Sequence, residues 1–239
     1  MKFLKFNTYE EMSAAAASIM AEQIKSKPNS VLGLATGSTP VGMYKKLIEM
    51  NKAGEIDFSD ITTVNLDEYY PIDPANNQSY RYFMNDNLCN HINIDMKRTN
   101  VLYGLAEDPD KECERYEELI KDLGGIDIQV LGIGQNGHIA FNEPEENLYL
   151  NTHKTALTES TIKANSRFFS EGEIMPTASL TMGMGTIFAA KKIILLINGK
   201  SKRAAFEQLL NDRFSTSCPA TILKLHPDVT VICDSEVAD

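Results

Sequence analysis

One segment of the chain brings a histidine and a carboxylate within five residues of each other. It runs Gly132-Ile133-Gly134-Gln135-Asn136-Gly137-His138-Ile139-Ala140-Phe141-Asn142-Glu143-Pro144. On a glycine-loosened loop, a carboxylate can orient an imidazole and stabilise its charged form, and such a pair exchanges protons near neutral pH. We therefore predict that His138 donates and accepts protons with help from Glu143. The alternative is a core histidine that a neighbouring carboxylate caps.

Three glycines of the same segment, Gly132, Gly134 and Gly137, match the dinucleotide-binding fingerprint G-x-G-x-x-G. That fingerprint opens a long helix. Pro144 follows Gly137 too soon for such a helix, because proline breaks a helix interior. We interpret the match as accidental and expect no dinucleotide at this segment.

Two adjacent carboxylates follow another predicted strand, in the run Asn65-Leu66-Asp67-Glu68-Tyr69-Tyr70. Burial in an apolar setting raises the pKa of a carboxyl group, and a raised pKa suits a carboxylate to carry protons for carbon acids. Asp67 is therefore a candidate catalytic base. The alternative for Asp67 or Glu68 is a loop-capping role.

A candidate anion-binding loop, Thr36-Gly37-Ser38-Thr39-Pro40, comes between a predicted strand and a predicted helix. Pro40 suits the first helical position, Thr39 suits the N-cap, and Gly37 lets the backbone approach a ligand. Because N–H groups and hydroxyls at a helix N-terminus bind phosphate, we expect Gly37, Ser38 and Thr39 to hold one. The loop lacks the Gly-Lys-Ser/Thr ending of nucleotide-binding loops, which argues against ATP. The alternative is a tight turn with a good cap.

Two cations further along the chain, Arg167 and Lys202, suit a phosphate held by this loop. Each could add charge-assisted hydrogen bonds to those from the helix N-terminus. The alternative for either is a solvated surface charge. The run 179–185, with the sequence S-L-T-M-G-M-G, is expected to pack tightly against the site rather than react.

The elements that must position these residues follow an alternating pattern. Strands are predicted at 30–35, 61–66, 126–132, 192–198 and 229–233, and helices at 9–26, 40–53, 80–91, 109–123 and 201–211. Strands that are apolar on both faces are typical of the middle of a parallel sheet. We predict an α/β fold: a doubly wound, mostly parallel sheet flanked by helices (Rossmann-like), in a single domain over residues 1–239. Ligands of such sheets bind beyond the carboxyl ends of the strands.

Composition excludes several other classes of protein. The 239 residues include 23 Lys and Arg against 33 Asp and Glu, a formal net charge of −10. This charge repels nucleic acid and anionic membranes, so we expect neither as a partner. A hydrophobic fraction of 43 % with 23 % charged residues is typical of a globular protein rather than a disordered, collagenous or coiled-coil chain.

Neither a membrane segment nor a cysteine-based site is predicted. The longest apolar run, Ile193 to Ile197, is too short to span a bilayer, and the polar start lacks the features of a signal peptide, so we expect a cytosolic protein. The four cysteines stand far apart and the histidines do not share metal-ligand spacing with them, so we expect no disulfide or structural zinc. The sequence does not decide between a monomer and a homo-oligomer.

Four motifs, in their order and spacing, resemble those of glucosamine-6-phosphate deaminases over nearly the whole chain. They are Thr36 to Pro40, Asn65 to Tyr69, Gly137 to Pro144 and Ala164 to Phe169. The resemblance implies conversion of D-glucosamine 6-phosphate and water to D-fructose 6-phosphate and ammonia. This is an aldose–ketose isomerisation coupled to loss of the amine. It implies no cofactor and no metal, and a small-molecule substrate as the partner.

The resemblance also implies roles for single residues. Asp67 resembles the proton acceptor that moves hydrogen from C2 towards C1 through an enolamine, and His138 with Glu143 resembles the group that opens the pyranose ring. Many members carry Asp two residues before the histidine, where this chain has Asn136. A neutral amide can orient His138 but cannot stabilise its charge, so we expect the pair to depend on Glu143. The implied phosphate-binding set is Ser38, Thr39, Arg167 and Lys202.

Two rival functions share some of these features. A 6-phosphogluconolactonase has a similar fold, phosphate loop and histidine loop, but it would not need Asp67 for carbon-acid chemistry or the continuation Phe141-Asn142-Glu143-Pro144. A sugar-phosphate-sensing domain of a transcriptional regulator would need a DNA-binding module, and the net charge has the wrong sign for one.

The resemblance bears on regulation as well. Longer members are activated by N-acetylglucosamine 6-phosphate, whose phosphate they hold with a Ser, an Arg and a Lys after the Asn-Glu-Pro motif. The equivalent residues here are Glu146, His153 and Thr155. Because these would repel or barely attract a phosphate dianion, we expect hyperbolic kinetics without this effector.

Overall fold

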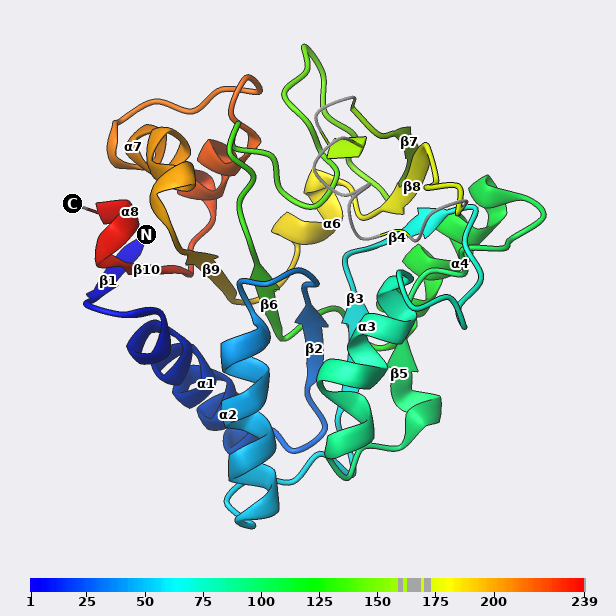
Figure 1. Ribbon diagram of the computed structural model, residues 1–239, viewed down its shortest axis with the longest axis horizontal. Coiled ribbons are helices and arrows are strands. Elements are labelled where there is room, and N and C mark those ends of the chain that lie inside the picture. The colour runs from blue at the N-terminus through cyan, green and yellow to red at the C-terminus, as the bar shows by residue number, and fades with distance from the viewer. Residues whose placement is uncertain (159–160, 163–168, 170–172, 239) are drawn as a thin grey trace.

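Seven parallel strands form the main sheet of the computed structural model, which describes residues 1–158, 161–162, 169 and 173–238 (Figure 1). Their order is β1 (Lys2–Phe6), β10 (Val229–Asp234), β9 (Ile193–Ile197), β6 (Ile128–Leu131), β2 (Val31–Leu34), β3 (Thr62–Asn65) and β5 (Thr99–Asn100). The five predicted strands are confirmed. The pattern missed β1, which is a mostly exposed edge strand, and β5, which is only two residues long.

Helices connect and flank these strands. They are α1 (Tyr9–Ser26), α2 (Val41–Lys52), α3 (Tyr80–Asn87), α4 (Pro109–Asp122), α6 (Met184–Phe188), α7 (Arg203–Leu210) and α8 (Ser235–Ala238). The predicted helix at 80–91 is divided, because Leu88 leaves helical geometry with φ −146° and ψ −62° before a short 3₁₀ turn, Cys89–His91. The α/β class is confirmed. None of the helices in the described ranges is both long and apolar enough to cross a membrane.

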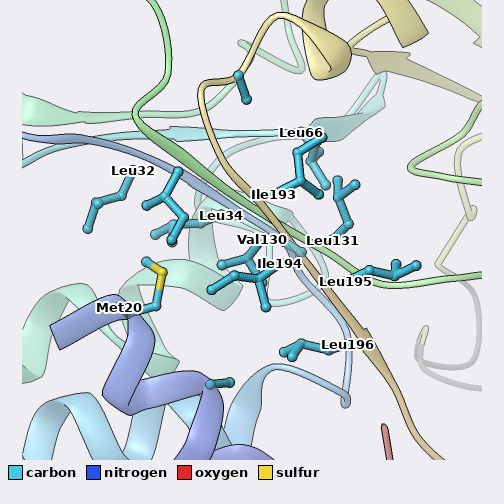
Figure 2. Packing of buried hydrophobic residues seen from close by; sticks show 14 of the residues in the cluster. Met20, Leu32, Leu34, Leu66, Val130, Leu131, Ile193, Ile194, Leu195 and Leu196 are labelled. Carbon is cyan, nitrogen blue, oxygen red and sulfur yellow. The ribbon is translucent and has the colours of Figure 1, made fainter. Parts of the chain in front are cut away.

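The core lies around the central strands, whose residues are buried on both faces. Figure 2 shows apolar side chains of β2, β6 and β9 packed together with Met20 of α1. Burial on both faces is the reason that these strands contain no charged residue and are mostly apolar or β-branched.

A second, three-stranded antiparallel sheet was not predicted. Its order is β4 (Asp67–Tyr70), β8 (Ala178–Thr181) and β7 (His153–Ala156). The sequence of β4, Asp-Glu-Tyr-Tyr, contains two carboxylates and therefore did not read as a strand. This small sheet sets the position of Asp67, the first residue of β4.

The order of the main sheet reverses between β2 and β6. The chain adds β3 and β5 on one side of β2, and then β6, β9 and β10 on the other side. Reversal points of this kind are where open α/β sheets bind ligands, because the loops after the two strands diverge and leave a crevice. The segments that follow β2, β3, β6 and β9 contain the residues with candidate chemistry.

Candidate active site

The loop after β2 presents backbone donors at the start of α2. Gly37 has φ +89°, a left-handed conformation that favours glycine, and an added Cβ there would have no atom within 4 Å. Within the described part of the chain, the N–H groups of Gly37, Ser38 and Thr39 have no acceptor. Three consecutive donors at a helix N-terminus suit an anion.

The predicted cap of α2 was wrong. The helix begins at Val41 with Pro40 as its N-cap, and no side chain of the cap residue bonds to the helix. The Thr39 hydroxyl instead donates to Oδ1 of Asn198 at 2.7 Å, which joins the loop after β2 to the segment after β9. The tertiary contact with Asn198 replaces the local capping bond that the Thr-Pro pair suggested.

Lys202 lies a few residues beyond that contact, at the end of the 3₁₀ turn Lys200–Lys202. Its side chain is partly buried, and burial lowers the pKa of its ammonium group. None of the carboxylates in the described ranges forms an ion pair with it. A partly desolvated cation without a counter-charge favours an anionic ligand. The other predicted cation, Arg167, lies outside the described residues.

Asp67 and Glu68 have different environments although they are adjacent. Both Glu68 oxygens accept backbone N–H bonds, from Tyr69 and Tyr80 at Oε1 and from Arg81 at Oε2, at 2.8 to 2.9 Å. Glu68 therefore anchors the start of α3, which is the capping role that the sequence left open. Burial raises the pKa of Glu68 to about 7, although the three N–H groups act against this rise.

Asp67 has the environment of a reactive carboxyl group. It is 7 % exposed, and none of the described residues donates a hydrogen bond to its carboxylate. Burial, and then the nearby Glu68 charge, raise the pKa of Asp67 to about 8. An aromatic cluster borders this region: the Tyr69 ring lies 4.7 Å from that of Tyr80, which stacks on Phe141 at 6.3 Å. A carboxyl group that titrates near neutral pH suits proton transfer.

The loop after β6 brings His138 and Glu143 together, as predicted. Nδ1 of His138 lies 3.3 Å from Oε1 of Glu143. The imidazole packs over Gly134, where an added Cβ would lie 2.3 Å from the ring. A carboxylate at Nδ1 favours the tautomer that carries its proton there, which leaves Nε2 to exchange a proton with a ligand.

Asn136 forms hydrogen bonds both to the Glu143 side chain and to the backbone of the loop. Its Nδ2 donates to Oε2 of Glu143 at 2.7 Å, and its Oδ1 accepts from the N–H of His138 at 3.2 Å. Thr161, which the sequence did not indicate, donates to Oε1 of Glu143 at 3.3 Å. Burial alone would raise the pKa of Glu143, but His138, Asn136 and Thr161 together hold that pKa below its ordinary value. Glu143 is therefore ionised at neutral pH.

Strand β8 and the residue after it connect Asp67 to the histidine loop. Thr181 pairs with Asp67 across the small sheet, and its hydroxyl accepts from the N–H of Phe141 at 3.2 Å. Met182 donates its N–H to the Leu66 carbonyl at 2.8 Å and accepts from Nδ2 of Asn142, also at 2.8 Å. The expected packing role of the run 179–185 is confirmed for these residues.

The glycines after β6 do not open a helix. Residues 132–152, all of them described, contain turns and a short bridge but no helical segment. The helix that the dinucleotide fingerprint requires is therefore missing from this fully described segment, as expected from Pro144. Within the described ranges, His, Cys, Asp and Glu side chains form no group of three or more suited to a metal ion.

The fold and the site together define a class of protein. It is an α/β enzyme that, in its described residues, has a loop of free backbone donors, a buried carboxyl group and a histidine–carboxylate pair near the reversal point of a parallel sheet. A family model described as "Glucosamine-6-phosphate isomerases/6-phosphogluconolactonase" matches residues 6–232, and the chain belongs to this family.

Relatives within the family are similar over their full length. A glucosamine-6-phosphate deaminase of Thermoanaerobacter pseudethanolicus is 56 % identical over 238 residues, which covers 100 % of this chain and 94 % of the relative. One of Clostridium beijerinckii is 56 % identical over 239 residues and 99 % of its own length.

The family description names two activities, and a solved structure of each matches this chain. A monomeric glucosamine-6-phosphate deaminase matches with a TM-score of 0.96 and 47 % identity over 100 % of this chain and 99 % of that one. A 6-phosphogluconolactonase of Thermotoga maritima matches with a TM-score of 0.78 and 20 % identity, over 98 % of each chain. The second likeness shows the fold alone.

Proposed function

We propose that this chain is a glucosamine-6-phosphate deaminase, which converts D-glucosamine 6-phosphate and water to D-fructose 6-phosphate and ammonia. The observation that carries the proposal is Asp67, a buried carboxyl group with a pKa of about 8 at the start of β4, across β8 from the His138 loop. The relatives of more than 50 % identity that have this name support it.

Ring opening is assigned to His138. To open the pyranose, a group must take the proton from the C1 hydroxyl and return one to the ring oxygen. Nε2 of His138 can do both, because Glu143 at Nδ1 stabilises the imidazolium that forms in between. Asn136 keeps Glu143 in place and ionised, so a neutral amide suffices at this position.

Proton transfer between C2 and C1 is assigned to Asp67. The ionised carboxylate takes the C2 proton of the open-chain aldehyde. The C–H electron pair forms a C1–C2 double bond while the C1=O π pair moves to the oxygen, which takes up a proton, and the product is an enolamine. Return of the proton to C1 leaves an iminium at C2, to which water adds before ammonia departs. A pKa of about 8 suits both directions of this transfer at neutral pH.

The phosphate is assigned to Gly37, Ser38 and Thr39, with Lys202 and Arg167 as its cations. The donors of the loop and the partly desolvated ammonium of Lys202 support this assignment. The role of Arg167 rests on the resemblance of its motif. Binding energy from the remote phosphate holds C1 and C2 against the proton-transfer groups.

One assay tests the proposal. The purified protein should release equal amounts of ammonia and fructose 6-phosphate from glucosamine 6-phosphate, and it should leave 6-phosphogluconolactone unchanged beyond its spontaneous hydrolysis. Lactone hydrolysis without ammonia release would favour the hypothesis that the chain is a 6-phosphogluconolactonase. Binding of glucosamine 6-phosphate without turnover would favour a sensing role.

A cytosolic location and a single catalytic domain over residues 1–239 are part of the same proposal. All four cysteines, Cys89, Cys113, Cys218 and Cys233, are buried and free, which suits a reducing compartment. One main hydrophobic cluster runs from Met12 to Val237, which supports a single domain. Sedimentation of the purified protein would decide between a monomer and a homo-oligomer.

A further inference from the structure

Helix α2 has a cap that comes from a different helix. Its N-cap residue, Pro40, offers no side-chain acceptor. The N–H of Gly42, in the first turn, instead donates to the hydroxyl of Tyr9 at 2.7 Å. Tyr9 is the first residue of α1 and lies 33 positions earlier in the chain.

The same hydroxyl also contacts the anion-binding loop. It lies 3.0 Å from the carbonyl oxygen of Ser38 and 3.1 Å from that of Thr39, to which it donates. One phenol oxygen thus contacts three backbone groups of the segment 38–42. No residue nearby in sequence could do this, because the three groups converge on a point beside α1.

These contacts fix which side of the loop faces a ligand. In a trans peptide unit the carbonyl and the N–H point in opposite directions. With the Ser38 carbonyl turned towards Tyr9, the N–H of Thr39 points away from α1. Carbonyl oxygens repel an anion, so turning those of Ser38 and Thr39 towards Tyr9 keeps both away from the side of the loop to which the Thr39 N–H points. The Thr39 carbonyl has no N–H opposite it, because the next residue is Pro40.

Close packing of the two helices makes the arrangement possible. A Cβ at Gly42 would lie 2.3 Å from Oγ of Ser13 and 2.9 Å from Cε1 of Tyr9. The absence of a side chain at position 42 therefore allows the Tyr9 ring to reach the first turn of α2. Figure 1 shows α1 and α2 side by side.

We propose that Tyr9 is a positioning residue for phosphate binding: its hydroxyl holds the loop 37–40 in the conformation that presents its N–H groups to the substrate phosphate. The inference rests on the phosphate role proposed for this loop. Tyr9 does not touch the reacting carbons in this scheme, so its loss should weaken substrate binding and leave the chemical step unchanged.

Tyr9→Phe tests the inference, because it removes the hydroxyl and keeps the ring. We expect KM for glucosamine 6-phosphate to rise about tenfold while kcat stays within about twofold. The dissociation constant of inorganic phosphate, measured by calorimetry, should rise by a similar factor. The matched control is Tyr103→Phe, which removes a hydroxyl from a tyrosine that is 49 % exposed. It should change none of these values.

A second variant moves the hydroxyl without removing it. Gly42→Ala places a methyl group against Ser13 and Tyr9 and should raise KM and the phosphate dissociation constant in the same way. Thermal unfolding of all variants checks that they are folded, and if Tyr9→Phe does not fold, Gly42→Ala decides the test.

The outcomes separate this inference from the proposed function. If folded Tyr9→Phe keeps the wild-type KM and phosphate affinity, or loses kcat as much as kcat/KM, the inference is wrong. If wild-type protein releases no ammonia, the deaminase proposal fails, and the phosphate titrations alone decide the role of Tyr9. A wild-type protein that does not bind phosphate would overturn the inference directly.

Discussion

The loops after β2 and β6 follow neighbouring strands, yet their functional groups are held in different ways. The loop after β2 contains no ionisable side chain and is fixed from outside, by the hydroxyl of Tyr9 and by Asn198. The loop after β6 also has contacts from outside, with Thr181 and Met182, but its reactive groups are held by side chains of the loop itself, in the contacts of Asn136 and His138 with Glu143.

The difference reflects what each loop has to do. An anion is bound by backbone donors, whose direction a short glycine-containing segment cannot fix alone, so other elements must hold it. Proton transfer depends on titratable groups whose charges are set by close neighbours, and these can lie a few residues away. Changes at the first loop should therefore alter KM, and changes at the reaction groups should alter kcat and pH dependence.

The largest effect is expected from Asp67→Asn, which keeps the size of the side chain and removes its ability to accept a proton. We expect kcat to fall by at least about 10²-fold with little change in KM. Ammonia release under substrate saturation measures kcat. The adjacent Glu68→Gln is an informative comparison, because it should reduce stability through α3 rather than abolish proton transfer. Near-normal turnover of Asp67→Asn would remove Asp67 from the mechanism.

The pH dependence tests the same residue without a mutation. Asp67 accepts a proton only when ionised, and its pKa of about 8 means that the ionised fraction grows as pH rises towards 8. We expect kcat/KM of the free enzyme to rise by up to about tenfold per pH unit below pH 8 and then to level off. A rate that is already constant from pH 6 upward would mean that the base titrates lower than its burial indicates.

A smaller effect is expected at the loop after β6. Glu143→Gln removes the charge beside Nδ1 of His138, so kcat should fall about tenfold or more, while the rise of the rate towards pH 8, which is assigned to Asp67, should remain. Asn136→Ala keeps the charge of Glu143 and should mainly disturb geometry, with a smaller loss of kcat. If Glu143→Gln keeps the wild-type kcat, the histidine–carboxylate pair is assigned wrongly.

Lys202→Ala tests phosphate binding rather than proton transfer. Loss of one charge-assisted contact should raise KM for glucosamine 6-phosphate about tenfold and leave kcat nearly unchanged. Unphosphorylated glucosamine provides the control, because its weak binding should not depend on Lys202. An equal loss of affinity for both ligands would mean that the Lys202 ammonium group does not contact the phosphate.

No effect is expected from N-acetylglucosamine 6-phosphate. His153, at the position where longer family members carry Arg, is partly buried, and burial lowers the pKa of its imidazole. It lines a groove of about 400 Å³ with Asp110, Glu114, Glu117 and Glu118, whose charges repel phosphate. Rates measured against glucosamine 6-phosphate should follow a hyperbola with and without the compound. A sigmoidal curve that the compound makes hyperbolic would contradict this.

Sequence patterns predicted the central sheet and the chemistry of single loops. Runs of apolar and β-branched residues without charges indicated β2, β3, β6, β9 and most of β10, because strands buried on both faces are poor in charged residues. The pairing of His138 with Glu143 was also predictable, since both residues belong to one short loop.

Only the tertiary structure shows how the environments of the two adjacent carboxylates differ. Residue type alone does not separate Asp67 from Glu68, and the choice of Asp67 from the sequence depended on the resemblance. Their environments diverge because α3, which begins at Tyr80, donates its first N–H groups to Glu68 alone. The start of α2 was decided in the same way, by Asn198 binding Thr39 and by Tyr9 binding Gly42. Contacts between residues distant in the chain depend on how whole elements pack, and local residue types do not specify that packing.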